Sequence, residues 1–444
     1  MKVLVRNVHV FDGINNKITE SANIVIEDKL VIDISQEEIP EAGFDDLIDA
    51  RGYWAIPGLI DAHVHMGCTA GFATLDQMTT EEVVLRSGQL AHDMLYRGFT
   101  TVRDVASPTV GLNKVIDDAI IPGPRIYPSE SAISQTCGHS DYRQNRAQRQ
   151  NPIVGSDAPV QRHGFFRVAD GVPDVLKATR EQLFKGASQI KMMAGGGASS
   201  IFDPLDTVQY TLEEMQACVQ ATEDYGTYVC THIHIYPAML RAAEAGIKCF
   251  EHASLMNEEV AKVVKDKGIW LCPQYAVGEM IAERKIPLDS EIQYQKTERV
   301  GKGLMVQAEL VDKMGMLDQL VYGTDVVGTL DVHKMQPMEL GWRAKRFGAY
   351  QALKQATGNC HELFKLCTYQ DPYPEGEVGT LRKGSFADLL ILKENPMENS
   401  AQVENASNIL LIMKDGKLFK NMLETPDEIP MKQYPQLKYF PSDA

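Results

Sequence analysis

Residues 57–65 read PGLIDAHVH, a short apolar run that leads into two histidines separated by one residue. The run is typical of a buried strand, in which successive side chains point to opposite faces. His63 and His65 therefore point the same way where the strand ends. Two imidazoles on one face can share a metal ion, because neutral histidine is a common ligand of zinc and similar metals. We therefore expect a metal site at the end of this strand.

The middle of the chain alternates between strand-like and helix-like stretches. Helical periodicity marks residues 80–97, 211–225 and 237–245. Eight apolar runs have strand character: 58–65, 99–102, 125–127, 189–193, 228–231, 248–251, 269–272 and 319–322. Alternating strands and helices predict a parallel sheet covered by helices, and eight units predict a closed barrel. We therefore assign residues 58–375 to a (β/α)8 TIM barrel.

Both ends of the chain are rich in β-structure. Residues 23–27 and 29–33 are strand-like near the start, and residues 387–392 and 409–413 are strand-like near the end. Asp415-Gly416 is a typical hairpin turn. We expect residues 1–57 and 376–444 to form one small β-sandwich domain together, which makes the fold class α/β with a β appendage.

Two polar or irregular stretches interrupt the rhythm of the predicted barrel. They cover residues 138–175 and 273–302. Long loops on a barrel are often lids or specificity elements, so we expect both stretches to lie near the site.

Composition and charge exclude several classes of protein. The 444 residues are 44% hydrophobic and 23% charged, which is typical of a globular chain. A net charge of −16 argues against nucleic acid or an anionic membrane as the main partner. No apolar run approaches the roughly 18 residues of a membrane span, and the first residues lack the pattern of a signal peptide. We expect a cytoplasmic protein whose eight cysteines, none in a C-x-x-C pair, are reduced core residues.

Three further residues with ligand chemistry follow later predicted strands: His232, His252 and Asp325. The carboxyl ends of barrel strands meet at one mouth, so these side chains are expected to join His63 and His65 there. Taken singly, His252 could be a hydrogen-bonded core residue and Asp325 a helix cap. Taken together, they predict one metal-binding site.

Lys191 lies inside the apolar run 190–193, directly before the glycines Gly195–Gly197. Burial disfavours the charged ammonium and favours a neutral amine. A neutral amine can react with carbon dioxide to give a carbamate, which is an anionic ligand able to bridge two cations. The alternative is a lysine whose ammonium reaches the rim of the barrel.

The resemblance of this sequence is to the amidohydrolase superfamily, and it is carried by residues 57–65, Lys191, His232, His252 and Gly323-Thr324-Asp325. More narrowly, the chain is similar to the branch that holds zinc-dependent dipeptidases of the prolidase type and relatives of imidazolonepropionase. Residues 99–104 (FTTVRD), 138–141 (GHSD), 170–197 and 379–388 (GTLRKGSFAD) also look like that branch. The resemblance therefore covers nearly the whole chain.

The resemblance implies two divalent cations, with zinc as the default and manganese, iron or cobalt as alternatives. One cation would be bound by His63, His65 and Asp325, and the other by His232 and His252. Lys191, carboxylated, would bridge both. The six implied metal ligands are His63, His65, Lys191, His232, His252 and Asp325.

The resemblance also implies a mechanism, in which a hydroxide shared by the cations attacks the carbonyl carbon of an amide. Asp325 would accept the proton of that hydroxide and deliver it to the leaving amine. His139 matches a family histidine that assists catalysis as a partner of the oxyanion, and it would also contact the substrate. A simple hydrogen-bonding role in its loop is the alternative for His139.

Two positions depart from the family pattern. Family dipeptidases often carry tyrosine, in contact with the substrate carboxylate, where this chain has His234. Because His234 lies on the same strand face as His232, it is expected either to bind the substrate carboxylate when protonated or to support a metal ligand. The second departure is Cys137, since many relatives have two glycines before the histidine that corresponds to His139. Both departures bear on specificity.

The expected function is metal-dependent hydrolysis of the amide bond of a small molecule, either a dipeptide or an N-acyl amino acid. The resemblance also implies a homo-oligomer, since relatives often self-associate. Three alternatives stay open. They are a hydrolase of cyclic amides, which shares the metal centre, a deaminase, which generally lacks the bridging lysine, and a non-catalytic barrel, which usually loses its ligands.

Overall fold

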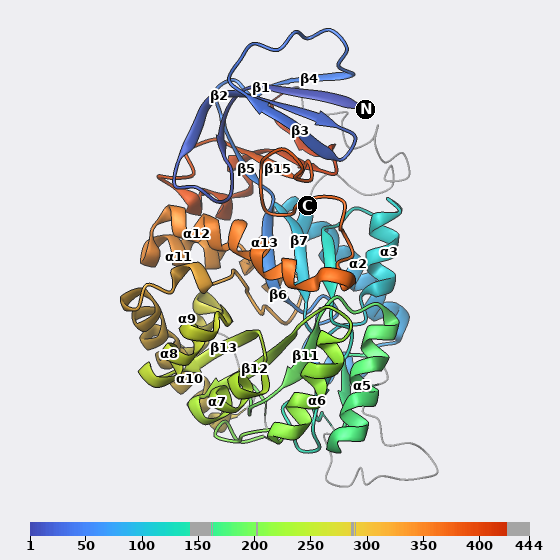
Figure 1. The fold of residues 1–444 in the computed structure, drawn as a ribbon, viewed down its shortest axis with the longest axis vertical. Helices are drawn as coiled ribbons and strands as arrows, with labels where there is room; N and C mark the ends of the chain where they lie inside the picture. The colour runs from blue at the N-terminus through green and yellow to red at the C-terminus, as the bar shows by residue number, and fades with distance from the viewer. Residues whose placement is uncertain (143–160, 162, 201–202, 286–287, 289, 424–444) are drawn as a thin grey trace.

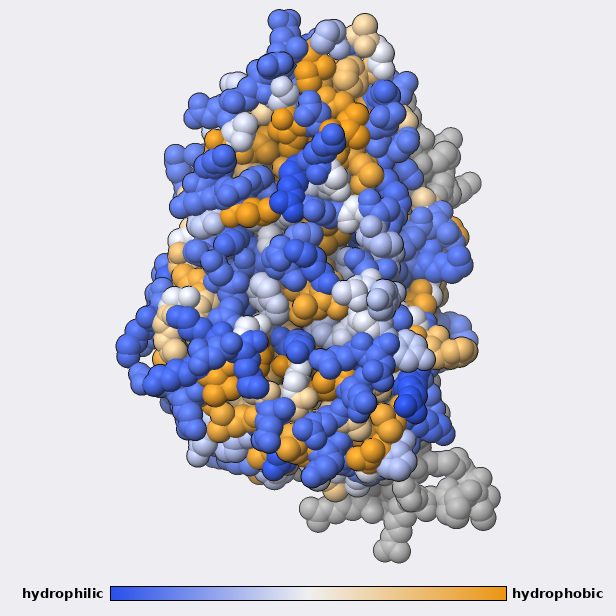
Figure 2. Space-filling model, in the orientation of Figure 1, coloured by the Kyte–Doolittle hydropathy of each residue, from blue (hydrophilic) through white to orange (hydrophobic). Residues whose placement is uncertain are grey.

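A barrel-like body of strands and helices carries a smaller sheet at one end of the molecule (Figure 1). The computed structural model describes residues 1–142, 161, 163–200, 203–285, 288 and 290–423. Among the described helices, none combines the length and the apolar character needed to cross a bilayer. Hydrophilic residues cover most of the face seen in Figure 2, and apolar residues gather over the small sheet at the top of that view.

The smaller part is a sheet of eight strands that both chain ends contribute. The strands are β1 (Lys2–Phe11), β2 (Ile18–Glu27), β3 (Leu30–Ser35), β4 (Asp46–Asp49), β5 (Trp54–Pro57), β15 (Leu389–Leu392), β16 (Ile409–Lys414) and β17 (Lys417–Asn421). They are hydrogen-bonded in the order β17-β16-β15-β5-β1-β2-β3, with β4 beside β1. The antiparallel pair β5–β15, in which Ile56 lies opposite Leu390, joins the two ends. The predicted association of both chain ends in one β unit is seen here as a single sheet.

A buried arginine connects this sheet to the barrel. Arg125, at the start of a barrel strand, contacts Asp388 and Asp415 of the C-terminal part. Its guanidinium also stacks over the ring of Phe386 at 3.7 Å. The boundaries that we place after residues 57 and 375 stay predictions.

The larger part is a ring of parallel strands. In chain order they are β6 (Leu59–Val64), β7 (Phe99–Asp104), β8 (Arg125–Pro128), β9 (Ala132–Ser134), β11 (Ile190–Met193), β12 (Val229–Ile235), β13 (Cys249–Leu255) and β14 (Trp270–Cys272). Strands β6-β7-β8 form one ladder, and β9-β11-β12-β13-β14 form another, to which the short β10 (Phe166–Val168) adds an edge. The amide of Ser188 donates to the carbonyl of Pro128 (2.7 Å) and links the two ladders.

The last of the eight strands predicted from the sequence, residues 319–322, closes the ring without forming a regular ladder. Its amide groups alternate between partners: Val321 donates to Leu271 (2.9 Å), whereas Tyr322 donates to Gln355 (2.9 Å) outside the barrel. The carbonyl of Tyr322 accepts from Ala62 of β6 (2.8 Å), and this bond completes the ring. The predicted TIM barrel is therefore confirmed, and its last strand is replaced by single backbone bonds.

Helices cover the outside of the ring (Figure 1). The amphipathic face of α2, for example, buries Val83, Leu90 and Met94 against the strands. The helices are α1 (Phe72–Leu75), α2 (Thr80–Tyr96), α3 (Val110–Asp117), α5 (Gly171–Lys185), α6 (Leu212–Glu223), α7 (Tyr236–Ala245), α8 (Glu258–Lys267), α11 (Met338–Phe347), α12 (Ala349–Gln355) and α13 (Gly358–Phe364). A capping box of Thr211 and Glu214 satisfies backbone groups at the start of α6.

The structure describes the two irregular stretches, residues 138–175 and 273–302, to different extents. Much of the first, 143–160 and 162, lies outside the described residues. The second contains α9 (Tyr275–Ala282) and the first half of α10 (Glu291–Lys313), so it is helical. All eight cysteines are free thiols, and all but Cys137 are buried, as expected for core residues.

Candidate metal centre and active site

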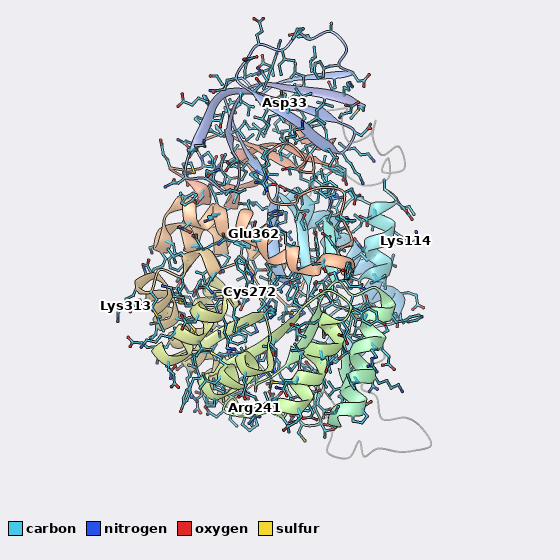
Figure 3. The ribbon with its side chains drawn as sticks, viewed as in Figure 1. Asp33, Lys114, Arg241, Cys272, Lys313 and Glu362 are labelled. Atoms are coloured by element: carbon cyan, nitrogen blue, oxygen red, sulfur yellow. The ribbon has the colours of Figure 1, made fainter. Side chains whose placement is uncertain are left out.

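One pocket of about 140 Å³ lies at the carboxyl ends of the barrel strands. Every residue that the sequence singles out for the site lines this pocket. These residues are His63, His65, His139, Lys191, His232, His234, His252 and Asp325. Cys272, labelled in Figure 3, lies in the interior of the barrel, whereas Lys114, Arg241 and Lys313 lie at the periphery. The roles assigned to the eight residues stay predictions.

Asp325 lies among three histidines. Its carboxylate oxygens are 3.4 Å from Nε2 of His63, 3.1 Å from Nε2 of His65 and 3.9 Å from Nδ1 of His252. Burial alone would raise the pKa of Asp325, but the nearby imidazoles of His63 and His65 outweigh it and hold that pKa well below its ordinary value. Asp325 is therefore an anionic carboxylate in a cluster of imidazoles.

A buried carboxylate fixes the orientation of His63. Oε2 of Glu251 lies 2.7 Å from Nδ1 of His63, and Oε1 accepts a bond of 2.7 Å from Arg103. The other ring nitrogen, Nε2 of His63, is buried and has no hydrogen-bond partner. It faces Asp325. A carboxylate bound to one nitrogen of a histidine is the arrangement that orients metal-binding histidines in proteins.

Strand alternation would place Glu251 and His252 on opposite faces of β13. Left-handed backbone angles at His252 (φ 67°) and Ala253 (φ 48°) break that alternation, so both side chains reach the site. Gln307 of α10 donates to the carbonyl oxygens of both strained residues, at 2.8 Å each. Oε1 of Gln274 lies 2.5 Å from Nδ1 of His252. These contacts hold His252 in the lining of the pocket.

His232 and His234 lie on one face of β12, two residues apart. The rings of His232 and His252 are 4.6 Å apart, and Nδ1 of His234 lies 2.9 Å from the hydroxyl of Ser254. Burial, helped by His139 and other imidazoles, holds the pKa of His232 well below its ordinary value. Burial likewise lowers the pKa of His234 to about 3, so the ring is neutral at pH 7. A neutral His234 can meet a substrate carboxylate only through an N–H bond.

Lys191 reaches the same pocket from β11. It is 1% exposed, and its register partner across the ladder is Cys230 of β12. Met193, two residues further along, also lines the pocket, as strand alternation requires. The position agrees with a lysine that faces the predicted metal ligands.

His139 stacks on His232, with ring centroids 4.0 Å apart and planes 18° apart. Its Nδ1 lies 3.3 Å from Oδ2 of Asp203, which also accepts a bond of 2.6 Å from the amide of Gly197. A side chain at Gly197 would collide with His139, because an added Cβ would lie 1.8 Å from its Cε1. Lys296 of α10 donates to the carbonyl oxygens of Gly197 and Asp203 and so secures this loop. The glycine run therefore allows backbone to approach His139.

Sequence reasoning did not assign Glu251, Gln274 or Asp203 to the site. A signal for Glu251 was available, because a glutamate inside the run CFEHASL needs a partner if the strand is buried. Arg103 in FTTVRD carries the matching charge. Asp203 lies in a polar loop, where nothing in the pattern distinguishes it.

The residues present fit divalent cations. Ligand atoms of His63, His252 and Asp325 lie within 4.8 Å of one another, and Nδ1 of His65 is buried without a hydrogen-bond partner. Imidazole and carboxylate ligands suit zinc and related metals. A second group in the described chain, His63 with Glu251 and Cys272, is less available because Arg103 and His63 occupy both oxygens of Glu251.

Known proteins match nearly the whole chain. The model of the amidohydrolase family matches residues 54–419. The chain belongs to the amidohydrolase family. This amidohydrolase is 30% identical to ochratoxinase from Aspergillus niger over 423 residues, which cover 90% of this chain and 83% of ochratoxinase. The predicted superfamily is therefore confirmed.

Solved structures extend the likeness. A prolidase complexed with N-methylphosphonate-L-proline matches this amidohydrolase with a TM-score of 0.86 at 29% identity, over 95% of this chain and 100% of the prolidase. A Xaa-Pro dipeptidase with methionine bound in its active site matches with a TM-score of 0.81 at 29% identity, over 95% and 100% of the two chains. These relatives support the predicted reaction class, hydrolysis of amide bonds.

Proposed function

We propose that this amidohydrolase binds two divalent cations and cleaves the amide bond of dipeptides or N-acyl amino acids that carry a free carboxylate. The observation that carries the proposal is the convergence of His63, His65, Lys191, His232, His252 and Asp325 on one pocket. The prolidase and the Xaa-Pro dipeptidase support the choice of a dipeptide-like substrate.

In this proposal, His63, His65 and Asp325 would hold one cation, and His232 and His252 would hold the other. Lys191, as its carbamate, would supply an anionic ligand to both, and zinc is the default ion. Cations at these positions would supply a Lewis acid for the carbonyl oxygen and lower the pKa of water.

The chain's own residues do the remaining chemistry. Asp325 accepts a proton at a carboxylate oxygen from the attacking water and passes it to the nitrogen of the leaving amine. His139 donates a hydrogen bond to the carbonyl oxygen as negative charge develops there. The neutral ring of His234, whose Nδ1 lies beside Ser254, contributes polar contacts to the substrate carboxylate.

The test is hydrolysis of a library of dipeptides and N-acyl amino acids by the zinc-loaded enzyme and by Asp325→Asn. We expect cleavage by the wild type and a loss of kcat by about 10²–10⁴-fold in the variant. Ring opening of a cyclic amide or release of ammonia from an aminopurine, without cleavage of the library, would instead identify a cyclic-amide hydrolase or a deaminase. An inactive but metal-loaded wild type would contradict the proposal.

A further inference from the structure

The pocket has an apolar wall that the metal centre does not use. It consists of Val277 and Ile281 on α9 and Val300 and Leu304 on α10, which we call the α9–α10 wall. All four side chains line the pocket beside the histidines, and Val300 and Leu304 are buried in a cluster with Leu205. A side chain of the substrate that extends past His252 therefore meets hydrocarbon.

Close packing fixes the position of this wall. A Cβ added to Gly278 would lie 2.3 Å from Leu304, and one added to Gly301 would lie 2.4 Å from Ala282, so α9 and α10 are in direct contact. Gly303 brings α10 equally close to the carbonyl of Ser254 on β13, at 2.5 Å. Because β13 also carries His252, the wall is held at a constant distance from the proposed metal ligands.

Another part of the pocket lining is apolar as well. Tyr142 stacks on Phe166 at 4.9 Å with planes 17° apart, and Met193 and Val327 line the pocket with them. Within the described part of the lining, the charged side chains besides the histidines are Lys191 and Asp325, and both belong to the proposed metal centre. A substrate side chain thus finds no counter-charge in either wall.

Two cations of α10 near the wall are engaged elsewhere. Lys296, one turn before Val300, donates to carbonyl oxygens of Gly197 and Ser200. Arg299 pairs with Asp206 at 2.7 Å. Neither side chain lines the pocket, so they leave the wall uncharged.

The volume of the pocket limits what it admits. At about 140 Å³ it is close to the roughly 150 Å³ of an apolar cavity that accommodates benzene. The proposed metal centre and the scissile amide share this space, so it admits at most one side chain beside them, and a buried charged group would lose its hydration without compensation.

We propose that the α9–α10 wall is a specificity subsite for an apolar side chain next to the scissile amide. The substrate class is then a dipeptide or N-acyl amino acid with one branched aliphatic or aromatic side chain, and substrates with lysine or glutamate at that position are rejected. This inference rests on the proposed function, because it concerns the same pocket.

The test compares kcat/KM of the zinc-loaded enzyme for substrates that differ in one residue: leucine, phenylalanine, glycine, lysine or glutamate. We expect leucine or phenylalanine to exceed glycine by about 10–200-fold, the range that apolar pockets achieve, with lysine and glutamate lowest. In Val300→Asp, and in the less buried Ile281→Asp, the ratio of the leucine to the lysine substrate should fall at least tenfold.

A matched control lies on the same helix. Val306 of α10 is 59% exposed and does not line the pocket, so Val306→Asp should keep the wild-type ratio. If Val300→Asp does not fold, as judged by thermal melting, Ile281→Asp decides the outcome. Equal cleavage of apolar and charged substrates by the wild type, or an unchanged ratio in the folded wall variants, would overturn the subsite alone. No cleavage of any substrate would overturn the proposed function and the subsite with it.

Discussion

Oε2 of Glu251 lies 2.7 Å from Nδ1 of His63, and both side chains are fully buried. The second oxygen of Glu251 is bound by Arg103, which also donates to the carbonyl of Ala62 at 2.5 Å. A strand-borne ion pair in the barrel interior therefore decides which nitrogen of His63 faces the pocket. Glu251 and Arg103 therefore orient a proposed metal ligand without lining the pocket themselves.

Removing the charge of Glu251 is expected to weaken metal binding. Glu251→Gln should lower zinc affinity by about 10–100-fold, the usual effect of losing a partner of a metal-binding histidine. It should also reduce the free energy of unfolding by about 3–5 kcal/mol, because Arg103 is left buried without its counter-charge. Competition with a zinc chelator and denaturant unfolding measure the two effects. Glu362→Gln, at an exposed position labelled in Figure 3, is the control and should change neither.

Asp203 is expected to position His139. His139→Asn should reduce kcat by about 10²–10³-fold, as for loss of one oxyanion partner, and Asp203→Ala by up to about 10²-fold through misplacement of the ring. If Asp203 acts through His139, adding Asp203→Ala to His139→Asn should cause no further loss of kcat. Equal metal content in all variants, measured by mass spectrometry, excludes a general effect on the site. Full additivity of the two losses would show that Asp203 has another role.

The backbone at Gly197 is expected to tolerate no side chain. Gly197→Ala places a methyl group where the ring of His139 lies, so kcat should fall by up to about 10²-fold. Gly111→Ala in α3 is the matched control, since nothing lies within 4 Å of its added Cβ. There the change should preserve kcat and raise stability by about 0.4–1 kcal/mol. Steady-state kinetics and thermal unfolding compare the pair, and equal kcat in both variants would refute the close approach.

Lys191 is expected to bind carbon dioxide. In ¹³C-bicarbonate, the wild type should show a carbamate carbon signal that Lys191→Ala lacks, and the variant should bind fewer zinc ions per chain. Lys191→Glu, which supplies a carboxylate at nearly the same place, should recover part of the metal content. Lys114→Ala, an exposed position labelled in Figure 3, should match the wild type in both measurements. A wild type without the signal at full zinc loading would exclude the carbamate.

The sequence predicts which residues gather at the pocket where each of them follows a local apolar run. His63 and His232 follow apolar runs within β6 and β12, and Asp325 follows the segment 319–322. The rule that strand ends meet at one mouth places them together. The assumption that side chains alternate along a strand gives a wrong prediction for β13. It puts Glu251 and His252 on opposite faces of β13, whereas the left-handed angle at His252 brings both inward, with its carbonyl bound by Gln307.

Long-range contacts account for the remaining differences. Asp203 reaches His139 only because the loop after β11 folds back onto the ring, with Lys296 of a distant helix donating to its carbonyls. The ladder at 319–322 is interrupted because the amide of Tyr322 finds Gln355 outside the barrel. Neither partner can be identified from local composition or periodicity.

Metal titration of the stripped enzyme tests the central claim most directly. After chelation, zinc is added in steps with bicarbonate present, and hydrolysis of a leucine-containing dipeptide is followed with the number of bound ions per chain. The proposal predicts no activity without metal and a rise that saturates at two bound ions. Full activity in the stripped enzyme, or a chain that binds no zinc, would contradict it.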